Sequence, residues 1–140
     1  MFPGTIIVTC AYLLFWYYLL LARQGRTKRR LEGEYAARGE VFDRYFGQDA
    51  EMLAVDRVVA NTHEQMVPFL VSMWLFSALV SSFYATVLGA TYLVLRVVYP
   101  MLLGKRLSKI NPMRVAYVTF PCYAIVLVFI VGSMLAALKL

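Results

Sequence analysis

Four long apolar runs constrain this chain more than any other feature of its sequence. They cover residues 3–22, 52–80, 83–103 and 115–138. About twenty apolar residues are enough for a helix to cross a hydrocarbon core roughly 30 Å thick. Within lipid the backbone must satisfy its own hydrogen bonds, and a helix does so inside one segment. The sequence therefore predicts an all-α integral membrane protein, a single four-helix bundle over residues 1–140.

Composition supports a chain that faces lipid and argues against other classes of protein. Hydrophobic residues make up 61% of the chain, and the mean hydropathy is +0.67. The formal net charge of +6 lies beside the apolar runs, so no nucleic-acid partner is expected. Cys10 and Cys122 lie inside apolar runs without a CxxC motif, which predicts two buried hydrophobic side chains and no disulfide. His63 has no second histidine, and we expect no metal.

The first apolar run is followed, not preceded, by basic residues. A secretory signal has its basic residues in front and ends at a small-residue cleavage site, so residues 3–22 are expected to remain a transmembrane helix. Residues 23–51 are charged and are interpreted as a loop, with a short helix near 34–38. Its aromatic side chains suit a membrane interface, although a solvated loop is the simpler alternative. These side chains are Phe42, Tyr45 and Phe46.

The two charged loops predict how the chain is oriented in the membrane. In a four-span protein, residues 23–51 and 104–114 lie on the same side, and both are rich in Lys and Arg. The opposite side has only a short N-terminus, a turn at Ser81 and Ser82, and Lys139. The positive-inside rule therefore places both loops in the cytosol, in a bacterial inner membrane or a eukaryotic endomembrane.

Polar and ionisable side chains share one helical face where the second apolar run begins. Arg57, Asn61 and Glu64 stand at positions i, i+4 and i+7. Such groups are costly at membrane depth and face a bundle interior, a cavity or a partner charge. Arg96 is expected at a depth similar to Glu64, so an ion pair between them would neutralise both. Two interpretations of that pair stay open: a purely structural salt bridge, and a binding site for a zwitterionic ligand.

Three of the apolar runs contain a proline in their interior, at Pro68, Pro100 and Pro121. Because proline cannot donate a backbone hydrogen bond, each one frees the carbonyl four residues earlier. Two of these carbonyls belong to Glu64 and Arg96, the ionisable residues of the membrane interior. A freed carbonyl in lipid needs a helix, a water molecule or a ligand as partner, and ordinary helix kinking is the alternative explanation.

These motifs, in this order, resemble the MAPEG family (membrane-associated proteins in eicosanoid and glutathione metabolism). The pattern Arg57-x-x-x-Asn61-x-x-Glu64, followed by Pro68-Phe69, resembles the family's second-helix signature. Arg96-x-x-Tyr99 is similar to its Arg-x-x-Tyr element, and Pro112-x-Arg114 is similar to its Pro-x-Arg element. The spacing looks most like the branch that contains the microsomal glutathione transferases and prostaglandin E synthase.

The resemblance implies a homotrimer that holds glutathione between adjacent subunits near the cytosolic side. The implied glutathione-binding residues are Arg57, Asn61, Glu64, Arg96 and Tyr99, with Arg23 or Arg26 on a glutathione carboxylate. The implied catalytic residue is Arg114, which would stabilise the glutathione thiolate. An adjacent guanidinium does lower the pKa of a thiol while keeping its own charge. The implied function is a transferase or peroxidase acting on lipophilic electrophiles or lipid peroxides.

The chain departs from the family pattern at three positions. Val59 stands where the family often has His or Gln, Leu103 replaces a second tyrosine, and Val115 replaces a serine after the catalytic arginine. The binding residues are therefore better supported than the activation of the thiol. Two alternative functions stay open: a non-catalytic lipid-binding protein of the same family, and a structural subunit of a larger membrane complex.

Overall fold

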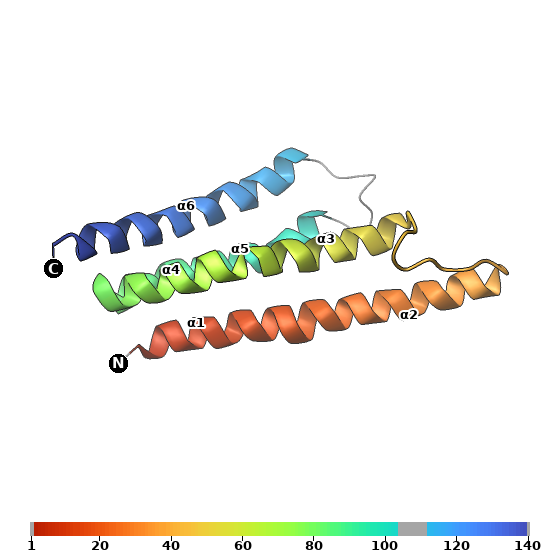
Figure 1. Ribbon diagram of the computed structural model, residues 1–140, viewed down its shortest axis with the longest axis horizontal. Helices are drawn as coiled ribbons and strands as arrows, with labels where there is room; N and C mark the ends of the chain where they lie inside the picture. Colours follow the sequence, from red (N-terminus) through yellow and green to blue (C-terminus); the bar gives the residue numbers. More distant parts are fainter. Residues whose placement is uncertain (1, 104–111, 140) are drawn as a thin grey trace.

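The computed structural model describes residues 2–103 and 112–139, and these residues form helices without any strand (Figure 1). This confirms the all-α fold class. The elements in chain order are α1 (Pro3–Leu14), the π-helical segment η1 (Phe15–Leu20), α2 (Leu21–Ala37), α3 (Ala50–Glu64), α4 (Met66–Leu79), α5 (Ser82–Leu103) and α6 (Pro112–Ala137).

The first three elements join into one uninterrupted helix, Pro3–Ala37, of 35 residues. The interpretation of 23–51 as a loop is therefore wrong for residues 23–33, and the short helix expected near 34–38 is the end of this long helix. Its charged residues are good helix formers, and they pair one turn apart. Lys28 lies 3.5 Å from Glu32, and Arg30 pairs with Glu34. Local charge pairing thus extends the helix beyond the apolar run.

Gly39 ends this long helix. Its φ of +73° is a left-handed conformation that only glycine adopts without strain. The Gly39 N–H donates to the carbonyl of Ala36, and the Glu40 N–H donates to the carbonyl of Tyr35. This pair of bonds is the Schellman motif, which satisfies the last carbonyls of a helix. The chain then reverses direction through residues 40–49 and returns to α3.

Asp49 begins α3 by capping its first backbone amides. Its Oδ1 accepts from the N–H groups of Glu51 and Met52, at 3.0 and 2.9 Å. Its Oδ2 accepts from the Tyr35 hydroxyl at 3.1 Å, which connects α3 to α2. One carboxylate therefore supports both the start of α3 and its contact with the long helix.

Replacing Asp49 by alanine should lower the stability of the protein by about 1 kcal/mol, the usual cost of losing an N-cap. Thermal unfolding in mild detergent, followed by circular dichroism, measures the change. Tyr35→Phe is the matched control, because it removes only the bond between the helices and leaves the cap in place. Equal unfolding temperatures for Asp49→Ala and Tyr35→Phe would show that the cap contributes nothing of its own.

The second apolar run is divided at Gln65 into α3 and α4, which follow one another along the same direction in Figure 1. Backbone bonds continue across the division, from Gln65 N–H to Asn61 and from Phe69 N–H to Gln65. Pro68 has no N–H to offer the Glu64 carbonyl, which explains an interruption at this point. The interruption of the helix expected from Pro68 is therefore present at Gln65, the residue after Glu64.

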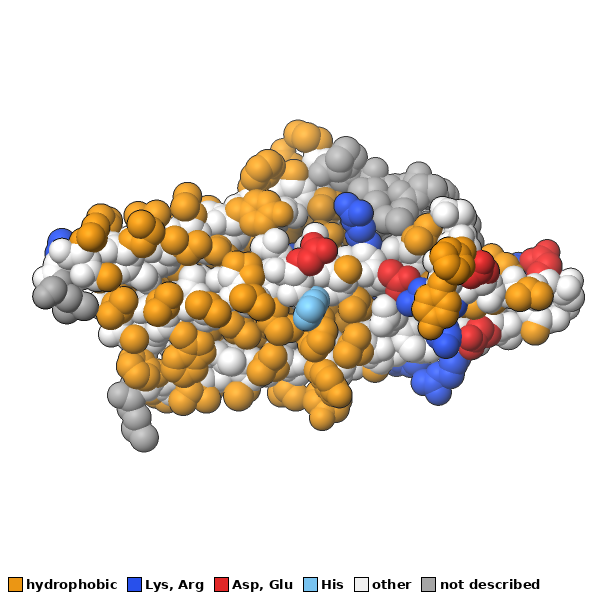
Figure 2. Space-filling model, viewed as in Figure 1, with side chains coloured by type: hydrophobic (Ala, Val, Ile, Leu, Met, Phe, Trp, Pro, Cys, Tyr) orange, Lys and Arg blue, Asp and Glu red, His pale blue; other side chains and the backbone are white. Residues whose placement is uncertain are grey.

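Three helices of the described residues are long and apolar enough to cross a membrane. They are Pro3–Ala37, Ser82–Leu103 and Val115–Ala137. The expected second span coincides with α3 and α4. With 15 and 14 residues, each of these helices is shorter than the roughly twenty residues that a membrane crossing needs. A crossing by α3 and α4 together stays a prediction. Figure 2 shows hydrophobic side chains over most of one face, with charged side chains gathered where α2 and α3 lie.

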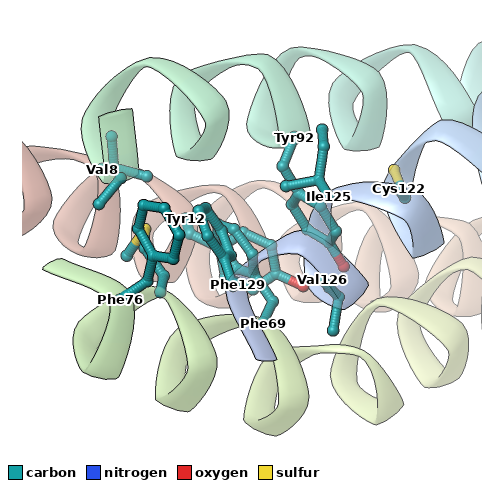
Figure 3. Close-up of a cluster of buried hydrophobic side chains, with 11 residues drawn as sticks. Val8, Tyr12, Phe69, Phe76, Tyr92, Cys122, Ile125, Val126 and Phe129 are labelled. Carbon is teal, nitrogen blue, oxygen red and sulfur yellow. The ribbon is translucent and has the colours of Figure 1, made fainter. Parts of the chain in front are cut away.

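Aromatic side chains dominate the core between α1, α4, α5 and α6 (Figure 3). The rings of Phe69 and Tyr92 stack with centroids 3.8 Å apart and an interplanar angle of 6°. Cys122 is buried in this core, as expected, whereas Cys10 is exposed and its predicted burial is wrong. Cys10 lies on the outer face of α1. Because α1 is apolar on all sides, its sequence does not indicate which face packs against the other helices.

Candidate functional site

Arg96 is the centre of the polar cluster inside the bundle. It stands on α5 and is only 1% exposed. Its Nε donates to the Tyr92 hydroxyl at 3.1 Å, and its Nη1 donates to Oδ1 of Asn61 at 2.8 Å. Its Nη2 is buried and has no hydrogen-bond partner among the described residues. A buried guanidinium therefore keeps an unused donor.

The expected ion pair between Glu64 and Arg96 does not form. The Glu64 side chain is exposed at the end of α3, and the Asn61 amide takes the place facing Arg96. Which residue of α3 meets α5 depends on how α3 is rotated about its axis, and the spacing of the residues does not determine that rotation. Among the described residues, no carboxylate lies within ion-pair distance of Arg96.

Arg57 and Glu64 both lie exposed on the surface of the bundle, on either side of the half-buried Asn61. Neither forms an ion pair with a described residue. Both lie close enough to Tyr99 to act on it electrostatically. The predicted stripe is therefore divided, because Asn61 faces Arg96 whereas the charged side chains of Arg57 and Glu64 are exposed.

Tyr99 and Tyr92 lie on either side of the Arg96 guanidinium. Its Cζ is 5.8 Å from the ring centre of Tyr99 and 5.4 Å from that of Tyr92, within the range of a cation–π contact. Both tyrosines are buried. The aromatic faces offer this cation partial compensation, but they supply no negative charge.

Tyr92 is a member of the cluster that motif reasoning missed. It is fully buried, it accepts from Arg96, and its ring is held by Phe69. The available signal was its position four residues before Arg96, which places both side chains on one face of α5. A tyrosine in an apolar run also fits a packing role, and this obscured the signal.

The remaining predicted residues lie on other helices, α2 and α6. Arg23 is half-buried and Arg26 is exposed, both on α2, and Arg26 Nε donates to the Ala22 carbonyl at 3.3 Å. Arg114 belongs to the first turn of α6, but its side chain lies outside the described residues.

His63 stacks on Trp16, with ring centres 5.1 Å apart. Within residues 2–103 and 112–139, no group of three or more His, Cys, Asp or Glu side chains could hold a metal ion.

Asp56, next to Arg57 on α3, accepts hydrogen bonds from α2 and from the segment that connects α2 to α3. We call the contacts of Asp56 with Gln24 and Arg44 the Asp56 clamp. Its two carboxylate oxygens accept from Arg44 at 2.8 and 2.9 Å, a bidentate pair. The Gln24 side chain donates to the same carboxylate at 2.7 Å. The polar stripe on α3 therefore begins directly after Asp56, whose side chain is held by three hydrogen bonds.

Comparison with known proteins agrees with the motifs of the second, third and fourth apolar runs. A family model described as the MAPEG family matches residues 6–137. No curated protein and no solved structure gives a match. The match covers nearly the whole chain, including the helices that hold Asn61 and Arg96 together. This protein therefore belongs to the MAPEG family.

Proposed function

We propose that this protein is a glutathione-dependent membrane transferase or peroxidase that acts on lipophilic electrophiles or lipid peroxides. The observation that carries the proposal is the state of Arg96, which is buried and finds neither a carboxylate nor a partner for its Nη2 in the part of the chain that the structure describes. Buried charges are normally paired, because leaving one alone in a medium of low dielectric is costly. The cluster therefore suits a ligand that brings a negative group to α5.

The charges around Arg96 fit those of glutathione, which has two carboxylates and one ammonium group. Arg96 and Arg57 would bind the first carboxylate together, and Glu64 would bind the ammonium. Asn61 and Tyr92 hold the Arg96 guanidinium from two sides. Arg23 or Arg26 would hold the second carboxylate, and Tyr99 would line the site. Bound glutathione supplies a thiol that serves as nucleophile or reductant, and Arg114 would favour its ionised form.

The proposed assembly is a homotrimer with its sites between adjacent subunits. Arg57 and Glu64 are exposed on a single bundle, on a helix that continues directly into the apolar α4. Charged side chains at such a position are costly when they face lipid. A neighbouring subunit that covers them, with the ligand between, removes that cost.

Native mass spectrometry in mild detergent should therefore show a trimer as the main species. The expected glutathione stoichiometry is one molecule for each subunit boundary. A stable monomer that still binds glutathione would contradict the location of the site between subunits, while leaving the binding residues themselves in place.

The proposed topology has four spans, with the basic segments in the cytosol. In a variant with Cys10→Ser and Cys122→Ala, a cysteine introduced at Arg29 should react with a membrane-impermeant reagent only from the cytosolic side. A cysteine at Ser82 should react only from the opposite side, because α4 and α5 meet there. Labelling of both positions from one face would show that α3 and α4 do not cross the membrane together.

Titration with glutathione tests the function itself. Detergent-solubilised protein should develop the ultraviolet absorbance of a thiolate as glutathione is added near neutral pH. S-methylglutathione is the matched control, since it has the same charges but no ionisable thiol, and it should bind without any thiolate signal. Binding without thiolate would favour a non-catalytic protein. Absence of binding would favour the lipid-binding or structural alternative.

A further inference from the structure

The segment that connects α2 to α3 exposes three large apolar side chains. Val41 is 91% exposed, Tyr45 85% and Phe46 88%. The neighbouring Phe42 instead packs edge-to-face on Tyr35, with ring centres 5.3 Å apart. The segment is therefore not uniformly exposed. One aromatic ring holds it against α2 while two others point away from the protein.

The turn that presents Tyr45 and Phe46 is tightly built. The Asp43 carboxylate accepts from both of their N–H groups, at 3.0 and 2.9 Å. These bonds, from Phe46 first and then Tyr45, hold the pKa of the Asp43 carboxyl below its ordinary value. A Cβ at Gly47 would lie 2.2 Å from the Asp43 carbonyl oxygen, so only glycine fits there. The two exposed rings are therefore held in place by a defined turn.

The Asp56 clamp determines how far this turn lies from the membrane. Gln24, which shares the carboxylate with Arg44, lies two residues beyond the first apolar run. From Gln24 the long helix rises about 20 Å to Ala37, at 1.5 Å per residue. The chain then folds back, as Figure 1 shows, and the Arg44 guanidinium returns to the level of Gln24. The Arg44 side chain thus places the turn that contains Tyr45 and Phe46 near the end of the first apolar run, within reach of a bilayer that this run crosses.

The charges near this level fit an anionic lipid surface. Arg29 lies on α2 about 8 Å above Gln24 by the same helical rise. It is exposed, its Nε donates to the Gly25 carbonyl at 3.3 Å, and it forms no ion pair with any of residues 2–103 or 112–139. Tyrosine and basic side chains are the residues that favour the headgroup region of a bilayer.

We propose that the turn of residues 41–46 is a membrane-surface anchor, whose Val41, Tyr45 and Phe46 side chains insert among the lipid headgroups of the membrane that α1 crosses. This anchor does not depend on the proposed glutathione chemistry. Its consequence for the site is mechanical: Arg44 connects the anchored turn to Asp56, and Asp56 precedes Arg57 on α3. Insertion of the turn therefore holds the start of the polar stripe at a fixed depth.

The test places an environment-sensitive fluorophore at Phe46→Cys in the full chain with Cys10→Ser and Cys122→Ala. The protein is reconstituted into nanodiscs of phosphatidylcholine with phosphatidylglycerol, which leave both faces accessible. The expected result is blue-shifted emission, quenching by lipids spin-labelled near the headgroup, and protection from aqueous iodide. Glu40→Cys, at the far end of α2, is the control position and should show the opposite pattern.

Each other outcome has a definite meaning. Iodide access at position 46 equal to that at position 40 would overturn the proposal. Protection from both iodide and the lipid quencher would also overturn it, because a neighbouring subunit would then cover the turn. In discs containing phosphatidylglycerol, Arg29→Gln should weaken lipid quenching at position 46. Asp43→Ala should raise iodide access there, while an unchanged circular dichroism spectrum and thermal unfolding temperature show that the bundle is intact. An unchanged signal in Asp43→Ala would contradict the role of the built turn.

Discussion

Arg96→Met should lower glutathione affinity on the order of a hundredfold or more, because the buried donor that the ligand needs is lost. The same change should leave the ligand-free protein as stable as before, or more stable. Methionine has a similar length and is apolar, so the change removes the desolvation cost of a buried charge, and this gain offsets the loss of the hydrogen bonds to Tyr92 and Asn61. Binding and stability are thus expected to change independently, which a purely structural role for Arg96 does not predict.

Isothermal titration and thermal unfolding of the same preparations measure both quantities. Tyr92→Phe is the matched control, since it removes only the acceptor of the Arg96 Nε and keeps the ring that stacks on Phe69. It should weaken binding by roughly fivefold to tenfold, the worth of about one hydrogen bond. Arg96→Lys should retain charge but lose the planar fork of donors, and should bind weakly. If Arg96→Met destabilised the protein and left affinity unchanged, Arg96 would be a packing residue.

Arg114→Ala should reduce turnover on the order of a hundredfold, the usual effect of removing one group that stabilises a developing anion. The expected cause is a higher pKa of the bound thiol. A neighbouring positive charge favours the thiolate, so its loss moves the appearance of thiolate absorbance to higher pH. Glutathione affinity should change less than turnover. Arg114→Lys should recover part of the activity, because an ammonium supplies charge without the fixed geometry of a guanidinium.

The comparison that separates binding from catalysis is with Arg57→Ala and Glu64→Gln. Each should weaken glutathione affinity roughly tenfold to a hundredfold, the range for a charge-assisted contact, with a smaller effect on the thiol pKa. Thiolate absorbance measured against pH at saturating glutathione distinguishes the two classes of variant. Each variant must first show the oligomeric state of the parent protein. Unchanged thiolate formation and turnover in Arg114→Ala would show that the catalytic assignment is wrong.

Long-range packing explains why parts of the candidate site could not be predicted. The sequence places Asn61 and Glu64 three residues apart on one helical face, and either could meet Arg96. The rotation of α3 against α5 decides for Asn61 and leaves Glu64 exposed. The stacking of Tyr92 on Phe69 likewise needs α4 and α5 side by side, whereas the contact between Tyr92 and Arg96 is local to α5. The Asp56 clamp likewise joins Gln24 and Arg44, which are far apart in the chain.

The sequence by itself determined what depends on short stretches of chain. The apolar runs predict helices because lipid leaves the backbone no other way to satisfy its hydrogen bonds, and Pro68 predicts the interruption beside Glu64 because it lacks an N–H. The order of the motifs identified the family. Only the tertiary structure decided that Arg96 meets Asn61 and that the chain folds back so that Arg44 meets Asp56. Both depend on how helices rotate and pack against one another, and local periodicity is compatible with several such arrangements.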